Sequence, residues 1–248
     1  KVLLTEDASL SGSLADYALN FFSASDESYV ALQGIHAMAE PGVYPLKLVA
    51  TFPDGSYQSF EQMVLVLSGY YPNDPILVVP PETLDPTITQ DEQDELITTI
   101  SQATPVRMWD GLFKNPSVYV DCFTSRYGNR REYRADDGSQ TYFSFHSGLD
   151  FCGGDGLQIS APATGKVVFA GPTIVRGNAT IIDHGWGVFS GYWHQSAQYV
   201  EVGQQVEVGD VIGLVGGTGR VTGAHLHWEV WVNKVQVNPM MWLEKEFP

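Results

Sequence analysis

The C-terminal half of the chain consists of short β-like runs. From Val118 onward, apolar and β-branched segments of six to eight residues recur, separated by glycines and other turn residues. No stretch of this half has the period of a helix of useful length. The runs are VYVDCF, KVVFAG, ATIIDHG, GVFSGYWH, VIGLVG and HLHWEVWV. This pattern predicts an antiparallel β domain over residues 116–248.

A short repeat lies inside this predicted domain. The segment VEVG at 200–203 returns at 206–209, within VEVGQQVEVGDVIG. The repeat predicts two tight turns of a β-roll or a barrel-sandwich hybrid. Lipoyl- and biotin-carrier domains have a similar pattern, but they need a lysine at a hairpin tip, and no lysine lies between Lys166 and Lys234. We therefore exclude a carrier domain.

The N-terminal part also has a β pattern. Apolar and polar residues alternate from Tyr44 to Phe52, and Pro53-Asp54-Gly55 then turns the chain toward a second apolar run, FEQMVLVL. This pattern predicts a hairpin within residues 41–68. We expect residues 1–70 to form an immunoglobulin-like β-sandwich, a fold that says little about activity.

Residues 71–115 are predicted to be a proline-rich connector with one helix. Five prolines between Tyr70 and Pro86 exclude a long helix or a central strand there. Thr89 followed by Glu92 has the spacing of a capping box, and an apolar stripe follows at Leu96, Ile97 and Ile100. These signals predict a helix over about residues 89–103.

The charge of the chain is strongly negative and uneven. The formal net charge is −16, with −12 in residues 1–115 and −4 in residues 116–248. Such acidity excludes nucleic acid as a partner, because phosphates require a basic surface. No apolar run approaches the roughly 20 residues that would span a bilayer. The chain begins at Lys1 without a signal-like segment, which fits a processed or trimmed chain in which any targeting peptide would be invisible.

Two motifs bring together residues that bind metals. In GAHLHWEV, residues 223–230, the flanking residues favour a strand, so His225 and His227 share one face. In SFHSGLDF, residues 144–151, His146 and Asp150 have an even spacing, and Gly148 permits a bend that closes them on a common point. Imidazole nitrogen and carboxylate oxygen are good zinc ligands, and three protein ligands with one open position are typical of catalytic zinc. Either motif alone is equally consistent with polar residues at a strand or turn.

HSGLD, YWH and GAHLHWEV, in this order and separated by β strands, resemble the lysostaphin-type (LytM-like) zinc metallopeptidases, which cut peptidoglycan peptides. The resemblance covers about residues 118–242. It implies that His146, Asp150 and His227 bind zinc, and that His194 and His225 are catalytic imidazoles that do not bind it. The sequence departs from the usual family wording at Gln195 and Ala224, neither of which is an implied ligand or base.

Other candidate residues are assigned no chemistry. His184 is expected to be structural, and Tyr192, Trp186 and Trp228 are expected to be packing residues. Cys122 and Cys152 fit one disulfide in an exported protein or two buried thiols, and Cys152 lies close enough to Asp150 to reach the metal as a thiolate. A thiolate there would fill the open position.

The sequence thus predicts an exported zinc (Zn2+) endopeptidase that hydrolyses peptidoglycan cross-links or stem peptides through an activated water and two histidines. The alternative is a catalytically silent wall-binding or hydrolase-activating protein on the same fold, and a zinc peptidase for ordinary extracellular proteins is a third reading. We expect an extracellular, periplasmic or cell-envelope location and a monomer. The acidic N-terminal part is expected to be a spacer or an adaptor, so a chain beginning near Asn115 would retain hydrolysis.

Overall fold

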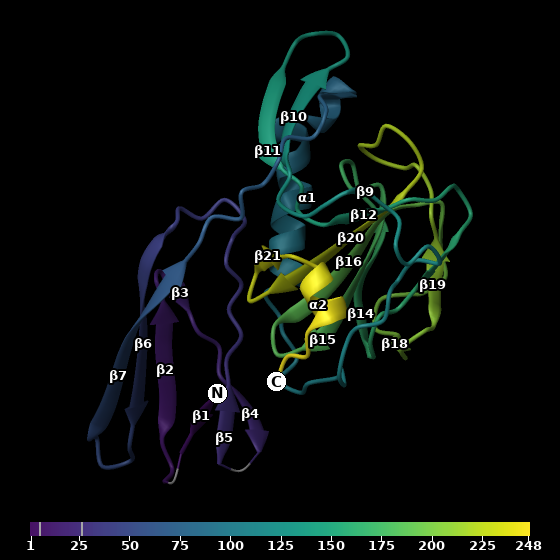
Figure 1. Ribbon diagram of the computed structural model, residues 1–248. Coiled ribbons are helices and arrows are strands. Elements are labelled where there is room, and N and C mark those ends of the chain that lie inside the picture. Colours follow the sequence, from purple (N-terminus) through teal and green to yellow (C-terminus); the bar gives the residue numbers. More distant parts are fainter. Residues whose placement is uncertain (5, 26) are drawn as a thin grey trace.

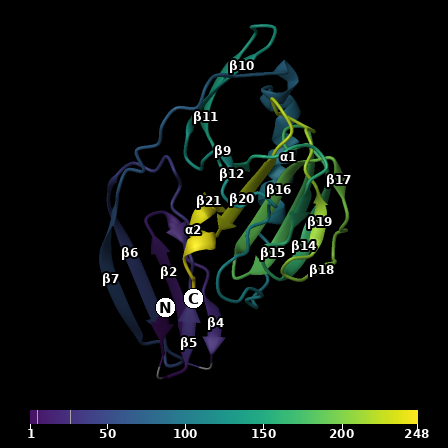
Figure 2. The same ribbon diagram turned by 45° about the vertical axis from the view of Figure 1, so that its right-hand side comes forward.

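The computed structural model describes residues 1–4, 6–25 and 27–248 (Figure 1). Strands dominate these residues, which confirms the expected mainly β architecture. The N-terminal strands form a lobe beside the C-terminal half, and the β10–β11 hairpin (Arg130–Ala135 and Thr141–Phe145) projects beyond both, as Figure 2 also shows. Within the described ranges, no helix combines the length and the apolar character needed to cross a membrane.

The N-terminal lobe contains two small sheets. One has the order β1-β5-β4 and the other β3-β2-β6-β7. The predicted hairpin is confirmed as β6 and β7, which pair along their full length. Its turn has Gly55 at φ +85, and the Asp54 carboxylate accepts from the main-chain N–H and the hydroxyl of Ser56. The strands are β1 (Val2–Leu3), β2 (Ser9–Leu14), β3 (Tyr17–Ala18), β4 (Phe22–Ser25), β5 (Ser28–Val30), β6 (Gly42–Thr51) and β7 (Tyr57–Val66).

This lobe has few buried side chains of its own. Val30 is the buried apolar residue among the described residues up to 70, and it belongs to the core of the C-terminal half. Phe22 stacks on Trp186 with ring centroids 6.2 Å apart. The lobe is therefore anchored where β4 and β5 pack against the C-terminal domain. The closer assignment to an immunoglobulin-like sandwich stays a prediction.

The C-terminal half is built on a large antiparallel sheet with the order β18-β14-β15-β16-β20-β12-β9, to which β21 adds beside β20. A smaller sheet, β13-β19-β17, lies next to it. The strands are β9 (Phe123–Ser125), β12 (Leu149–Phe151), β13 (Gln158–Ser160), β14 (Gly165–Pro172), β15 (Asn178–Gly185), β16 (Val188–Gln195), β17 (Ala197–Gln198), β18 (Gln205–Val206), β19 (Val211–Leu214), β20 (Leu226–Val232) and β21 (Val235–Val237).

The three central strands of this sheet are covered on both faces. Every residue of β16 and β20 is buried, which explains their unbroken apolar runs. One face carries the main core, with residues such as Tyr192 and Trp228. The other face is covered by the connector helix α1 (Pro86–Thr99), whose Leu96 packs with Trp193 and Trp231. The connector is therefore part of the C-terminal core.

The helix occurs within the expected connector but begins earlier than residue 89 and ends before residue 103. Asp85 is its N-cap: the carboxylate accepts from the N–H of Thr87, and Pro86 occupies the first turn. The predicted Thr89 cap is wrong, because Asp85 and Pro86 already supply the capping acceptor and the helical φ that start the helix. The preceding segment adds the strand β8 (Leu77–Val79), parallel to β10, and the 3-10 helix η1 (Pro81–Thr83).

The VEVG repeat forms two similar turns, as predicted. Gly203 and Gly209 have φ of +95 and +93, a backbone conformation that favours glycine. The N–H of Gln204 donates to the Glu201 carbonyl, and the N–H of Asp210 donates to the Glu207 carbonyl. The two turns flank β18, and the chain then enters β19. A short helix, α2 (Met240–Glu244), follows the last strand and packs Trp242 into the main core.

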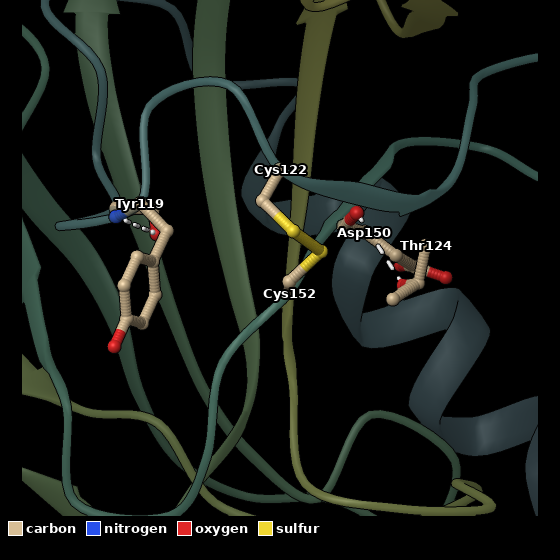
Figure 3. The surroundings of a disulfide bond; sticks show 6 residues. Tyr119, Cys122, Thr124, Asp150 and Cys152 are labelled. Atoms are coloured by element: carbon tan, nitrogen blue, oxygen red, sulfur yellow. Dashed lines mark hydrogen bonds between the residues drawn. A yellow bond between two sulfur atoms is a disulfide. The ribbon is translucent and has the colours of Figure 1, made fainter.

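Cys122 and Cys152 form a disulfide (Figure 3). It joins the chain just before β9 to the chain just after β12, and the N–H of Cys152 also donates to the Cys122 carbonyl. The sequence left open whether Cys152 reaches a metal, and the disulfide excludes that alternative. The cross-link closes a loop of 30 residues around the strand that carries Asp150.

We expect removal of this cross-link to lower the free energy of unfolding by about 3 kcal/mol, because the unfolded chain regains the entropy of the open loop. The measurement is urea unfolding of the wild-type protein, oxidised and reduced, beside the Cys122→Ala/Cys152→Ala variant. The variant should match the reduced wild type and should not respond to reductant. An unchanged midpoint after verified reduction would contradict the expectation.

Candidate metal centre

Three predicted ligand residues meet on neighbouring strands. His146 follows β11, Asp150 lies in β12, and His227 lies in β20 opposite Asp150 in the strand register. His146 Nε2 lies 2.9 Å from Asp150 Oδ1 and 3.0 Å from His227 Nδ1, and His227 Nδ1 lies 2.7 Å from Asp150 Oδ1. All three side chains are buried. One atom of each residue therefore faces a common point.

The outward atoms of these three residues are held by other groups. His146 Nδ1 is 2.9 Å from the Arg126 carbonyl oxygen, to which it donates. His227 Nε2 donates to Glu229 Oε1 at 3.0 Å, and Asp150 Oδ2 accepts from Arg131 Nη2 at 2.8 Å. Such partners fix the tautomer and orientation of metal ligands. The donor set of two imidazoles and one carboxylate, each oriented from behind, fits a zinc ion.

The electrostatics of the cluster also suit a cation. Burial lowers the pKa of His146 to about 4, which keeps the imidazole neutral and its lone pair available. Burial acts to raise the pKa of Asp150, but His146 and His227 hold it well below its usual range. Burial likewise acts to raise the pKa of Glu229, yet its hydrogen bond and charge interaction with His227 bring it to about 2. Two buried carboxylates therefore stay ionised beside these histidines, and a bound metal cation would interact favourably with their charge.

Two more histidines adjoin the three. The rings of His194 and His225 lie 5.1 Å apart, and the rings of His194 and His227 lie 6.1 Å apart. Nδ1 of His194 donates to the Thr218 carbonyl at 2.8 Å, and Nδ1 of His225 donates to the Gly223 carbonyl at 2.8 Å. Each ring thus has Nε2 as its unprotonated nitrogen, and Nε2 of His225 lies 3.5 Å from Asp150 Oδ1. The structure therefore brings all five predicted residues into one cluster.

His194 is held in an unusual conformation. Its φ is +64, in the left-handed region that a non-glycine residue seldom adopts. Burial, together with the neighbouring His225 and His227, holds its pKa well below the ordinary value. His194 is accordingly a neutral imidazole at neutral pH.

The two remaining histidines and the predicted packing residues Tyr192 and Trp228 lie outside the cluster. His184 is fully buried, with Nδ1 donating to the Thr164 carbonyl and Nε2 2.7 Å from the Ser190 hydroxyl. Tyr192 and Trp228 are core residues. His36 packs against Phe145 at 4.7 Å between ring centroids. None of these residues contributes an atom to the cluster.

The cluster opens into a groove of about 520 Å³. One wall comes from η1 and α1, and another from the β10–β11 hairpin. His194, His227 and Glu229 line it, together with three arginines: Arg131, Arg176 and Arg220. The connector, which the sequence presented as a linker, thus shapes the space where a ligand would lie.

Sequence reasoning missed Glu229, Arg131 and Asp74. Glu229 follows His227 at strand spacing, so the period of two that placed His225 beside His227 could have identified it. Arg131 had no such signal. Its Nε donates to Asp74 in the connector at 3.0 Å, while its Nη2 holds Asp150, and this chain of contacts spans 76 sequence positions.

Comparisons with known proteins show a similarity that is centred on the residues of this cluster. Residues 144–239 match the model of Peptidase family M23. DD-carboxypeptidase/endopeptidase Mpg of Neisseria meningitidis is 42% identical over 95 residues, and peptidoglycan DD-endopeptidase ShyA of Vibrio cholerae is 41% identical over 95 residues. Each alignment covers 38% of this chain and 22% of the relative, so the chain spans about a fifth of the length of these curated relatives.

The similarity to one solved structure extends over nearly the whole chain. A crystal structure from Pseudomonas aeruginosa, assigned as a peptidase M23, is 26% identical, with a TM-score of 0.69. The alignment covers 96% of this chain and 88% of that one. The matched segment contains all five clustered histidine and aspartate residues. Residues 144–239 are therefore similar to Peptidase family M23, and the similarity includes every residue of the candidate metal centre.

Proposed function

We propose that this protein is an exported zinc endopeptidase that hydrolyses peptide bonds in peptidoglycan. The observation that carries the proposal is the convergence of His146, Asp150 and His227 on one point beside two imidazoles with unprotonated Nε2 atoms, at the floor of a groove. His146, Asp150 and His227 would hold the zinc. When bound, zinc acidifies a water molecule and polarises a carbonyl oxygen.

The two remaining histidines suit the proton transfers that hydrolysis requires. A proton must leave the attacking water, and a proton must reach the amine nitrogen as the C–N bond breaks. His194 is neutral, and its Nδ1–H is occupied by Thr218, so Nε2 is the atom that can accept the first proton. His225 has the same tautomer and is more exposed than His194, so its Nε2 can take up a proton from solvent and pass it to the leaving amine, while the proton held by His194 returns to solvent.

The substrate and the location rest on supporting observations. The family match, together with a relative named as a peptidoglycan DD-endopeptidase, supports peptidoglycan peptides as the substrate. The disulfide supports an oxidising compartment, such as the periplasm or the extracellular space. A silent relative on the same fold is disfavoured, because the full set of ligand and imidazole residues is present and oriented.

The test is metal analysis combined with digestion of purified peptidoglycan. We expect about one zinc per chain and the appearance of new amino groups as peptide bonds are hydrolysed. Chelation should stop this hydrolysis, and added zinc should restore it. Mass spectrometry of the products identifies the bond. Undiminished hydrolysis after complete metal removal would refute the proposed mechanism, and absence of any digestion by the zinc-loaded protein would refute the proposed substrate.

A further inference from the structure

Arg220 occupies a fixed position in the groove. It lies in the loop between β19 and β20, five residues before His225, and lines the same cavity as His194 and His227. Its guanidinium stacks on the Tyr133 ring at 4.3 Å from the centroid. Nη1 donates to the Thr83 carbonyl in η1 at 3.0 Å. The loop, the β10 strand and the connector therefore hold this side chain together.

Arg220 differs from the other two groove arginines in its charge partners. Arg131 pairs with Asp74 and Asp150, and Arg176 pairs with Glu92. Among the residues that the structure describes, no carboxylate lies within 4.0 Å of Arg220. Burial and the charges of the other two arginines act to lower its pKa, and the pKa lies below the ordinary value of an arginine.

A partly buried cation without a counter-ion carries a desolvation cost that a bound anion would offset. The chain has a net charge of −16, yet three of its 13 Lys and Arg residues line this one groove. Because Nη1 already binds Thr83, the Nε and Nη2 edge of Arg220 has no acceptor among the described residues. That edge is the planar fork that binds a carboxylate through two parallel hydrogen bonds.

We propose that Arg220 is a specificity residue that binds a free carboxylate of the peptide substrate close to the scissile bond. The inference rests on the proposed function and narrows its substrate: peptides that carry a free carboxylate beside the cleaved bond are preferred over uncharged peptides. Tyr133 and Thr83 position the guanidinium, and the substrate carboxylate supplies its missing counter-ion.

The test compares a purified cross-linked muropeptide with the same muropeptide after conversion of its free carboxylates to carboxamides. The wild-type protein should hydrolyse the carboxylate form with a kcat/KM about 10- to 100-fold higher, the range expected for hydrogen bonds between charged groups. Arg220→Gln should reduce kcat/KM for the carboxylate form to that of the carboxamide form and leave the carboxamide form unchanged. Arg220→Lys should recover part of the preference, since it keeps the charge but loses the fork.

The matched control is Arg134→Gln, which removes an exposed arginine of β10 that pairs with Glu132. This substitution should not change kcat/KM for either muropeptide form. Zinc content and thermal unfolding of each variant verify folding. Equal hydrolysis of both forms by the wild-type protein would overturn the inference and leave the proposed function standing. An equal loss on both forms in Arg220→Gln would likewise overturn it, because it would show a merely structural arginine.

Binding provides a readout that does not need turnover. The two muropeptide forms are titrated calorimetrically into His225→Ala and into the double variant His225→Ala/Arg220→Gln. His225→Ala should bind the carboxylate form about 10- to 100-fold more tightly than the carboxamide form, and the double variant should bind both forms equally. Failure of the wild-type protein to hydrolyse either form would contradict the proposed function. The binding preference of His225→Ala would still test the role of Arg220. Equal binding of the two forms to His225→Ala would overturn the inference.

Discussion

Replacing His225 with alanine should leave zinc bound and reduce peptidoglycan hydrolysis by about 10²- to 10⁴-fold, the usual contribution of a positioned acid–base group. His225 donates from Nδ1 to Gly223 and directs Nε2 toward the cluster, but the three proposed ligands do not depend on it. His227→Ala should instead lose most of the zinc together with hydrolysis, because it removes a ligand atom and the partner of Glu229. The measurements are zinc content by atomic emission and kcat/KM on one muropeptide.

His36→Ala is the matched control, since it removes a histidine that packs on Phe145 outside the cluster. It should keep both zinc and turnover. Loss of zinc from His225→Ala would place that residue among the ligands and contradict the assignment. Wild-type turnover in His225→Ala would show that the reaction needs no imidazole at that position.

A chain that begins at Asn115 should lose most of its hydrolytic activity, whereas a chain that begins at Tyr71 should keep most of it. The sequence led us to expect an active chain from Asn115 onward, but the connector before that residue supports the site. Asp74 holds Arg131 and thereby Asp150, and α1 covers the outer face of the main sheet. Breaking one buried ion pair costs about 3–5 kcal/mol, so we expect a loss of at least 100-fold with the shorter chain.

The contribution of the connector to hydrolysis can also be tested by single substitutions in the full-length protein. The Glu92 carboxylate accepts from the N–H groups of Ile174, Val175 and Arg176, and it ties α1 to the loop at the groove edge. Glu92→Gln should lower kcat/KM about tenfold through the loss of a charged hydrogen-bond acceptor. Glu95→Gln, one turn along the same helix on an exposed side chain, should have no effect. Full activity of the chain that begins at Asn115 would refute the role of the connector.

The features that the sequence predicted depend on local patterns. The strand period of two placed His225 beside His227, and the even spacing of HSGLD placed His146 near Asp150. The hairpin of residues 41–68 and the paired VEVG turns follow from alternation and turn residues within a dozen positions. The start of α1 was misplaced because two capping signals compete, and the stronger pair, Asp85 with Pro86, starts the helix earlier.

By itself, therefore, the amino-acid sequence determined the mainly β architecture, the motif residues of the candidate metal centre and the resemblance to a metallopeptidase family. Only the tertiary structure decided that Cys122 pairs with Cys152, that the N-terminal lobe takes its buried anchor from the C-terminal core, and that the connector forms a groove wall. It also decided that Arg131 links Asp74 to Asp150, and that no carboxylate of the described residues lies within 4.0 Å of Arg220. Contacts between residues tens of positions apart depend on how complete sheets and helices pack, and no local period or turn signal encodes them.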